Sequence, residues 1–274
     1  MMSILETNFD AVKEAYKSVF EALERALLKF DIDFYLIGAQ SRDVWTNHID
    51  MEKRVSRDID YFVLINDTGT WSELNTYLIE TEKFERDKDQ PYRFYLEEHT
   101  IDLIPFGGIE NNGEVVLDNP PMELSVYGSK EVAEEAEIIH GKYKVVTLPG
   151  LCILKLVAYN EKPDSRAKDW QDMLLILRNY SEIAGAQLFD GFCDDLIEGN
   201  FEFKVASARM LGRHMNVILR KNDGLKERVI EILSGKLMNF KPVEIDQMYQ
   251  AKDRDDTQIE TLKLLCEVIK GIND

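Results

Sequence analysis

Two aspartates stand one residue apart at the start of an apolar run. Asp58 and Asp60 flank Ile59, and the run continues as IDYFVLI to Ile65. Alternate residues of a strand point to the same face, so a strand here would set the two carboxylates side by side. Carboxylates this close repel each other unless a cation lies between them, and hard oxygen ligands suit magnesium (Mg²⁺). The pair predicts a magnesium site, with a solvated strand entrance or an acidic cap as the alternative.

A third carboxylate lies in a later apolar segment. Asp102 is the single acid within residues 101–104, IDLI. A buried carboxylate without a partner is costly. If this segment forms a strand beside residues 59–65, Asp102 joins the other two aspartates at one site. The alternative is an acid on an edge strand that faces water.

A glycine turn precedes these acids. In LIGAQS, residues 36–41, a short strand ends at Gly38 and a small polar turn leads into a helix. Backbone N–H groups and the Ser41 hydroxyl could reach a phosphate group at such a helix N-terminus. An ordinary strand-to-helix turn is the alternative interpretation.

The pattern of apolar residues divides the chain near Pro149. Before it, short apolar runs alternate with amphipathic segments, and after it nearly all segments have helical spacing. We therefore predict an α+β protein, with a small mixed-sheet core in residues 1–148 and a helical domain in residues 149–274. The first helix is expected to be capped by Thr7 or Asn8. The predicted strands span residues 34–37, 59–65, 92–96, 100–104, 115–117 and 143–148, and the predicted helices span residues 9–30, 41–47, 71–84, 130–139, 151–158, 170–177, 184–198, 205–220, 224–234 and 256–271.

The order of these features is more specific than any one of them. A glycine turn, an Asp-x-Asp pair and a single later acid make residues 30–180 resemble the nucleotidyltransferase superfamily related to DNA polymerase beta. Within it, the chain is most similar to the bacterial AbiEii-like group, which includes toxins of toxin–antitoxin pairs. Arg54 and Ser56 match that family's Arg-x-Ser/Thr-x-Asp-x-Asp pattern. The family usually has Gly-Gly or Gly-Ser where this chain has Gly38-Ala39.

The resemblance also extends past the core. The family has a lysine and then a basic-Asp-x-x-Asp run, and this chain has Lys155 followed by Lys168, Asp169 and Asp172. These lysines could contact a triphosphate or RNA, and the aspartates could support the site or join helices. A solvated helix face with ion pairs is the alternative. The resemblance implies nucleotide binding by Gly38, Ala39, Ser41, Arg54, Ser56, Lys155, Lys168 and Asp169.

The resemblance implies magnesium-dependent transfer of a nucleoside monophosphate from a nucleoside triphosphate (NTP) to an acceptor hydroxyl. Asp58, Asp60 and Asp102 would be both the catalytic and the metal-binding residues. The family's acceptors are small molecules such as aminoglycosides, proteins and the tRNA 3′ end, and a toxin would have a cognate antitoxin as partner. The alternative is a catalytically inactive nucleotide-binding or partner-binding protein that keeps the same fold.

Charge and composition narrow these options. The net charge is −18, which disfavours broad binding to phosphate backbones unless a local basic patch overrides it. A basic stretch between Arg209 and Lys221 could receive RNA, or it could be an ordinary polar helix face. No run approaches the roughly 20 apolar residues of a membrane span, and the N-terminus has no signal-peptide pattern. Three cysteines without C-x-x-C spacing also suit a soluble cytoplasmic protein.

Overall fold

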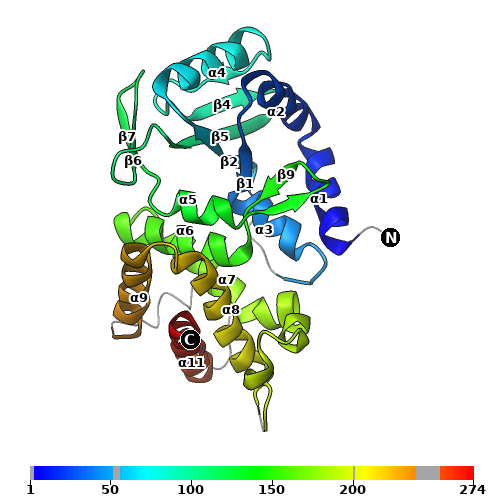
Figure 1. Cartoon of the computed structure of the whole chain (residues 1–274), viewed down its shortest axis with the longest axis vertical. Coiled ribbons are helices and arrows are strands. Elements are labelled where there is room, and N and C mark those ends of the chain that lie inside the picture. The colour runs from blue at the N-terminus through cyan, green and yellow to red at the C-terminus, as the bar shows by residue number, and fades with distance from the viewer. Residues whose placement is uncertain (1–2, 52–55, 200, 239–253) are drawn as a thin grey trace. The chain divides into compact units, whose positions relative to one another are not determined.

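The computed structural model describes residues 3–51, 56–199, 201–238 and 254–274 (Figure 1). The chain forms two compact units, Met1–Thr147 and Leu148–Asp274. The first unit holds a mixed β-sheet with helices and the second is helical. The predicted α+β fold class is therefore confirmed.

A mixed sheet is the centre of the first unit. Among the described residues it has seven strands in the order β3-β4-β5-β2-β1-β9-β8 (Figure 1). The pairs β2–β5 and β1–β9 are parallel, and the other neighbours are antiparallel. The strands β6 and β7 pair separately as a hairpin. The strands are β1 (Phe34–Ile37), β2 (Asp58–Ile65), β3 (Glu85–Arg86), β4 (Arg93–Leu96), β5 (His99–Gly107), β6 (Glu114–Leu117), β7 (Met122–Ser125), β8 (Glu137–Ile139) and β9 (Tyr143–Val145).

The helix predicted over residues 9–30 is two helices. Tyr16 interrupts it with φ −121° and ψ 35°, because apolar spacing alone does not reveal a break of one residue. The first helix begins earlier than predicted and is capped by Ser3, in a capping box with Glu6, not by Thr7 or Asn8. The helices of this unit are α1 (Ile4–Ala15), α2 (Lys17–Phe30), α3 (Gly38–Thr46), α4 (Thr68–Glu80) and α5 (Ser129–Glu134).

The helix predicted over residues 130–139 is also wrong. Helix α5 ends at Glu134, and Glu137–Ile139 forms β8, which pairs with β9. His140 and Gly141 both have positive φ, the geometry of a tight hairpin turn. This turn directs the chain into the sheet, and the helical spacing of the preceding apolar residues gave no sign of it.

The second unit packs its helices around a core that includes Trp170, Met173 and Leu211. The helix predicted over residues 184–198 is wrong, since that segment forms two short 3₁₀ turns. Gly185 and Gly191 within the segment lower its helix stability. In the described part of the chain, no helix has the length and apolarity needed to cross a membrane. The elements are α6 (Leu148–Glu161), α7 (Ala167–Ala184), η1 (Gly185–Phe189), η2 (Asp194–Leu196), α8 (Phe203–Leu219), α9 (Asp223–Met238) and α11 (Arg254–Asn273).

Candidate active site

The three aspartates predicted from the sequence lie on one face of two neighbouring strands. Asp58 and Asp60 are alternate residues of β2, so their side chains share a face. Asp102 on β5 is the register partner of Asp60 across the parallel β2–β5 pair. Paired strands lie about 4.8 Å apart, which makes Asp60 and Asp102 neighbours on the sheet. Asp58 and Asp60 are half-buried and Asp102 is buried, with 7 % exposed.

The glycine turn lies directly against this carboxylate face. Strand β1 runs antiparallel to β2 with Ile37 opposite Asp60, and α3 begins at Gly38. Gly38 has φ +67°, and a Cβ added there would lie 2.0 Å from Oδ2 of Asp60. The next residue, Ala39, is an ordinary helical residue without positive φ. The left-handed position therefore falls on the glycine, and the alanine that differs from the family pattern fits without strain.

Two polar side chains at the start of α3 fix the turn in place. The hydroxyl of Ser41 is fully buried and donates to the carbonyl of Val146 at 2.6 Å. Gln40 donates to the Tyr16 hydroxyl at 2.8 Å and, at 3.4 Å, to the carbonyls of Ser56 and Asp58. Gln40 therefore ties the entrance of β2 to α3. The side chain of Ser41 connects α3 to the segment after β9, so backbone N–H groups are what the turn offers a phosphate.

Arg93 is the main residue that the sequence analysis did not find. It lies opposite Asp102 on the antiparallel β4–β5 pair, and its guanidinium donates two hydrogen bonds of 2.7 Å to that carboxylate. These hydrogen bonds hold the pKa of Arg93 well above its usual range, although burial acts in the opposite direction. The register of the hairpin could have predicted this contact, because pairing Leu96 with His99 places Arg93 opposite Asp102.

An aromatic residue connects this site to the helices. Tyr16 lies at the break between α1 and α2, and its ring is 4.9 Å from that of His99. Burial raises the pKa of Tyr16, and the negative charges of Asp43 and Asp58 raise it further. The hydroxyl therefore stays protonated at neutral pH next to the carboxylates.

Among the described residues, one group of side chains brings possible metal-ligand atoms within 4.8 Å of one another. Glu97, Glu98 and His99 form it at the β4–β5 turn. The two glutamates are exposed and His99 is half-buried. The group is an open surface turn, unlike the carboxylate face of β2 and β5.

Of the remaining predicted residues, Arg54 and Ser56 precede β2 in the sequence. Arg54 lies outside the described residues, and Ser56 is half-buried just before β2. The others belong to the second unit. There, the ammonium group of Lys155 on α6 lies 3.1 Å from Asp169 and 2.7 Å from Asp172.

These carboxylates determine the charge of the lysine. Burial lowers the pKa of Lys155, but Asp172 and Asp169 outweigh burial and raise it. Arg166 adds a cation 3.5 Å from Asp169, and Lys168 is exposed on the first turn of α7. The structure therefore brings Lys155 and Asp169 together as a connection between α6 and α7.

The carboxylate face suits a divalent cation. Its donors are hard carboxylate oxygens from Asp58, Asp60 and Asp102, which Mg²⁺ prefers. The absence of a side chain at Gly38 keeps the backbone close to Asp60. A cation bound by these carboxylates would therefore lie beside the N-terminus of α3, where N–H groups attract anions.

Comparisons with known proteins give one weak likeness. No family model matches the chain, and no curated protein matches it. A solved structure with some similarity is the solution structure of the antibiotic-resistance factor ANT(2'')-Ia. The similarity covers 86 % of this chain and 98 % of that chain, with 10 % sequence identity and a TM-score of 0.37. At this TM-score the likeness carries no functional weight, so the function is inferred from the residues of the chain.

Proposed function

We propose that this chain is a magnesium-dependent nucleotidyltransferase that moves a nucleoside monophosphate from an NTP to an acceptor hydroxyl. The observation that carries the proposal is the register of the sheet, which pairs Asp60 with Asp102 and sets Asp58 two residues before Asp60 on the same face. Three carboxylates on one face have little structural purpose, since each repels the others. A site for a cation with a polyphosphate explains why they stand together.

In this proposal each residue has a defined task. Asp58, Asp60 and Asp102 would hold magnesium, which when bound neutralises the triphosphate and the charge that develops during transfer. The N–H groups at the start of α3, around Gly38 and Ala39, would bind phosphate oxygens. Gln40 would keep the backbone of Ser56 and Asp58 in place.

Arg93 supports a second candidate function. Its two hydrogen bonds occupy the Asp102 carboxylate, as expected of a protein that binds nucleotide without turning it over. In an active enzyme, Arg93 would hold the Asp102 carboxylate in its orientation until magnesium binds. Nucleotide binding that never leads to a transferred label would favour the inactive protein.

For the residues of the second unit, the surroundings favour a structural task. The ammonium of Lys155 is held by Asp169 and Asp172. Lys168 is exposed and remains a candidate phosphate contact. We therefore include Lys168 among the nucleotide-binding residues and expect Lys155 and Asp169 to stabilise the helical unit.

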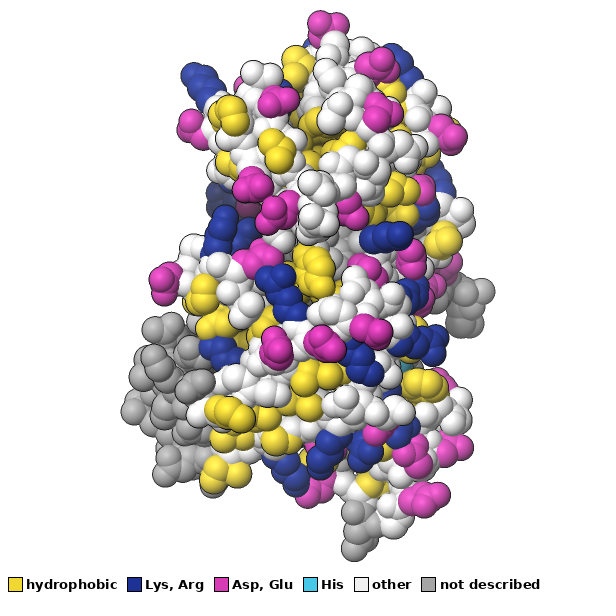
Figure 2. Space-filling view, turned by 60° about the vertical axis from the view of Figure 1, so that its left-hand side comes forward, with side chains coloured by type: hydrophobic (Ala, Val, Ile, Leu, Met, Phe, Trp, Pro, Cys, Tyr) yellow, Lys and Arg dark blue, Asp and Glu magenta, His cyan; other side chains and the backbone are white. Residues whose placement is uncertain are grey.

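Charge favours a small molecule or a protein as acceptor. The net charge is −18, and acidic and basic side chains are interspersed over the face shown in Figure 2. The basic stretch is partly neutralised on α8, because Arg209 pairs with Asp274 and Arg213 pairs with both Asp274 and Asp195. A tRNA acceptor would have to rely on other cations.

The similarity to the AbiEii-like group adds a biological role to the proposal. In that role the chain is a toxin, and a cognate antitoxin binds it. A protein partner that co-purifies and suppresses transfer would support this role. Full transfer activity in the presence of every co-purifying protein would argue against it.

The central experiment incubates the purified protein with Mg²⁺, each labelled NTP, and three acceptor pools: total RNA, extract proteins and a panel of aminoglycosides. Asp60→Ala should abolish labelling, whereas Asp89→Ala, which removes an exposed aspartate of the same unit, should leave it unchanged. The labelled pool names the acceptor class. Undiminished labelling by Asp60→Ala would refute the metal assignment.

A further inference from the structure

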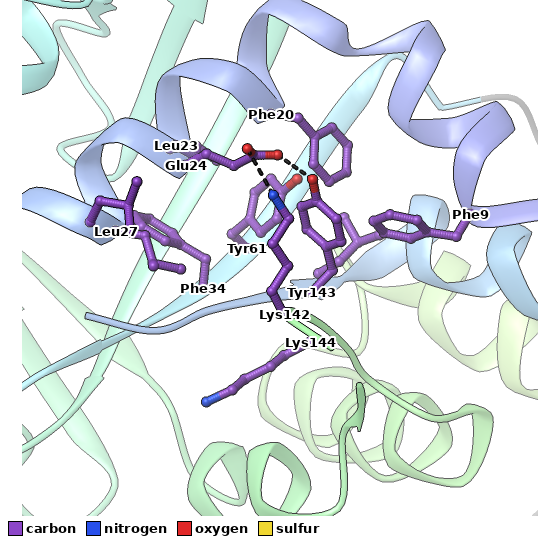
Figure 3. A pocket seen from close by; sticks show the side chains of 12 residues that line it. Phe9, Phe20, Leu23, Glu24, Leu27, Phe34, Tyr61, Lys142, Tyr143 and Lys144 are labelled. Carbon is purple, nitrogen blue, oxygen red and sulfur yellow. Dashed lines mark hydrogen bonds and ion pairs between the residues drawn. The ribbon is translucent and has the colours of Figure 1, made fainter. Parts of the chain in front are cut away.

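The sheet has a second face that the carboxylates do not use. Tyr61 follows Asp60 on β2, so its side chain points to the opposite face. Leu36 of β1 is the register partner of Tyr61. A cavity lies on this face within the first unit (Figure 3). It is lined by Phe9, Phe20, Leu23, Glu24, Leu27, Leu28, Phe34, Leu36, Tyr61, Lys142, Tyr143 and Lys144.

The size and lining of the cavity suit one aromatic ring. Its volume is about 110 Å³, and most of its surface is apolar. For comparison, an engineered apolar cavity of roughly 150 Å³ in another protein binds benzene. Leu28 lines the cavity and is 82 % exposed, which places it where the cavity meets solvent. A small ligand therefore has both a space and a way in.

One end of the cavity is polar. The hydroxyls of Tyr61 and Tyr143 and the carboxylate of Glu24 gather there (Figure 3). Tyr143 donates to Glu24, but the buried hydroxyl of Tyr61 has no hydrogen-bond partner in the part of the chain that the structure describes. A buried polar group without a partner costs about 1–3 kcal/mol. An oxygen atom on a ligand would remove that cost.

The charged residues around the cavity pair with one another. Glu24 accepts hydrogen bonds from Lys13 at 3.1 Å and Lys142 at 3.0 Å. Lys144 pairs with Asp33. Three lysines and two carboxylates leave one positive charge among these groups, but each ammonium already lies against a carboxylate at the cavity wall, so the apolar interior suits a neutral ligand.

We propose that this cavity binds a neutral molecule with a single aromatic ring and one hydroxyl or carbonyl oxygen, which hydrogen-bonds to Tyr61. The ring packs among Phe20, Leu27 and Phe34. None of these residues belongs to the carboxylate face, so the site does not depend on nucleotidyl transfer.

The test titrates the full chain with 4-fluorophenol and follows the ¹⁹F signal by NMR, with fluorobenzene in parallel. We expect saturable binding of 4-fluorophenol and a rise in the unfolding temperature. Leu27→Trp should fill the half-buried cavity wall and abolish binding. The matched control Ile4→Trp adds the same ring at a position that is 61 % exposed and outside the lining, and should bind normally.

A second variant tests the hydrogen bond. Tyr61→Phe should weaken 4-fluorophenol binding about tenfold and leave fluorobenzene binding unchanged, as expected for the loss of one hydrogen bond. Circular dichroism checks that each variant is folded, and Leu27→Phe replaces Leu27→Trp if the larger ring prevents folding. Absence of saturable binding, or binding that survives the folded Leu27 variant, would overturn the proposal. Equal affinity of Tyr61→Phe and the wild type for 4-fluorophenol would overturn the role of the hydroxyl.

Discussion

Two clusters of a cation with carboxylates, one in each unit, differ in what surrounds them. In the helical unit, Lys155 is held between Asp169 and Asp172 of α7. In the sheet unit, Arg93 holds Asp102, and Asp58 and Asp60 stand half-buried on the same face. The first cluster is a closed joint between two helices. The second is an ion pair beside two further carboxylates, Asp58 and Asp60, which are partly accessible to solvent.

This difference separates structural from functional acids. A buried ion pair does little for stability compared with apolar residues of the same size, but the loss of one partner is costly. Lys155 therefore contributes to stability mainly because its removal would leave Asp169 and Asp172 without their cation. Arg93 can lose its partner to a competing cation, because magnesium would satisfy the same carboxylate. Stability with and without magnesium distinguishes the two clusters.

The largest effect is expected for Lys155→Met. It leaves two largely buried carboxylates without their main cation, which should lower the free energy of unfolding by about 3–5 kcal/mol. Urea titration measures this loss, and added Mg²⁺ should not change it. The control Lys168→Met removes an exposed lysine and should change the free energy of unfolding by less than about 0.5 kcal/mol. If both variants changed the free energy of unfolding by similar amounts, the ion pairs of Lys155 would not stabilise the helical unit.

Arg93→Met should cost less, about 2 kcal/mol without magnesium, because Arg93 is partly exposed to water, with 23 % of its side chain accessible. With millimolar Mg²⁺ the loss should shrink, since the cation replaces the guanidinium next to Asp102. The measurement is a pair of urea titrations with and without Mg²⁺. If Mg²⁺ did not reduce the loss of unfolding free energy, the Arg93–Asp102 pair would be structural, like the ion pairs of Lys155.

The sequence alone predicts the central strands and the aspartates of the candidate site, but not all of the residues that contact them. Short apolar runs rich in strand formers identified β1, β2 and β5. Asp60 and Asp102 were predicted to meet on the condition that their strands are adjacent, and the register meets that condition. The order of strands in the sheet is not written in local sequence, because it depends on packing between segments far apart in the chain.

The residues that escaped prediction did so for different reasons. Arg93 was within reach, because the register of a hairpin with a short turn gives its partner directly. Gln40 carries no signal in sequence, since a neutral amide at a helix start suits many surroundings. The bond of Ser41 to Val146 spans 105 residues, so only the folded chain shows that this hydroxyl lies in the core.

Gly38→Ala is expected to give the next largest loss of stability. The collision that it creates is confined to the carboxylate face. A left-handed alanine costs about 1–2 kcal/mol, and its Cβ would collide with Asp60. We expect lower stability and loss of nucleotidyl transfer. Gly141→Ala is the matched control, because Gly141 has φ +70° with no atom within 4 Å of an added Cβ. It should have the backbone cost alone and keep transfer activity. Full activity of Gly38→Ala would separate this turn from the site.

The smallest effect is expected for Glu24, whose side chain is 31 % exposed, more than that of Arg93 or Lys155. Burial raises the pKa of Glu24, but hydrogen bonds from Tyr143, Lys142 and Lys13 outweigh burial and lower it to about 2. In the unfolded chain its pKa is about 4.3, so the folded state binds the proton more weakly. The resulting stability is present above about pH 4.3 and is lost as the pH falls towards 2.

Glu24→Gln should therefore remove a contribution on the order of 1–2 kcal/mol at neutral pH, after solvent screening of this 31 % exposed side chain. Its free energy of unfolding should fall less steeply than that of the wild type between pH 4.5 and about 2. Urea titrations at several pH values measure both curves. If the two curves stay parallel, the three donors stabilise the folded chain without holding the charge of Glu24.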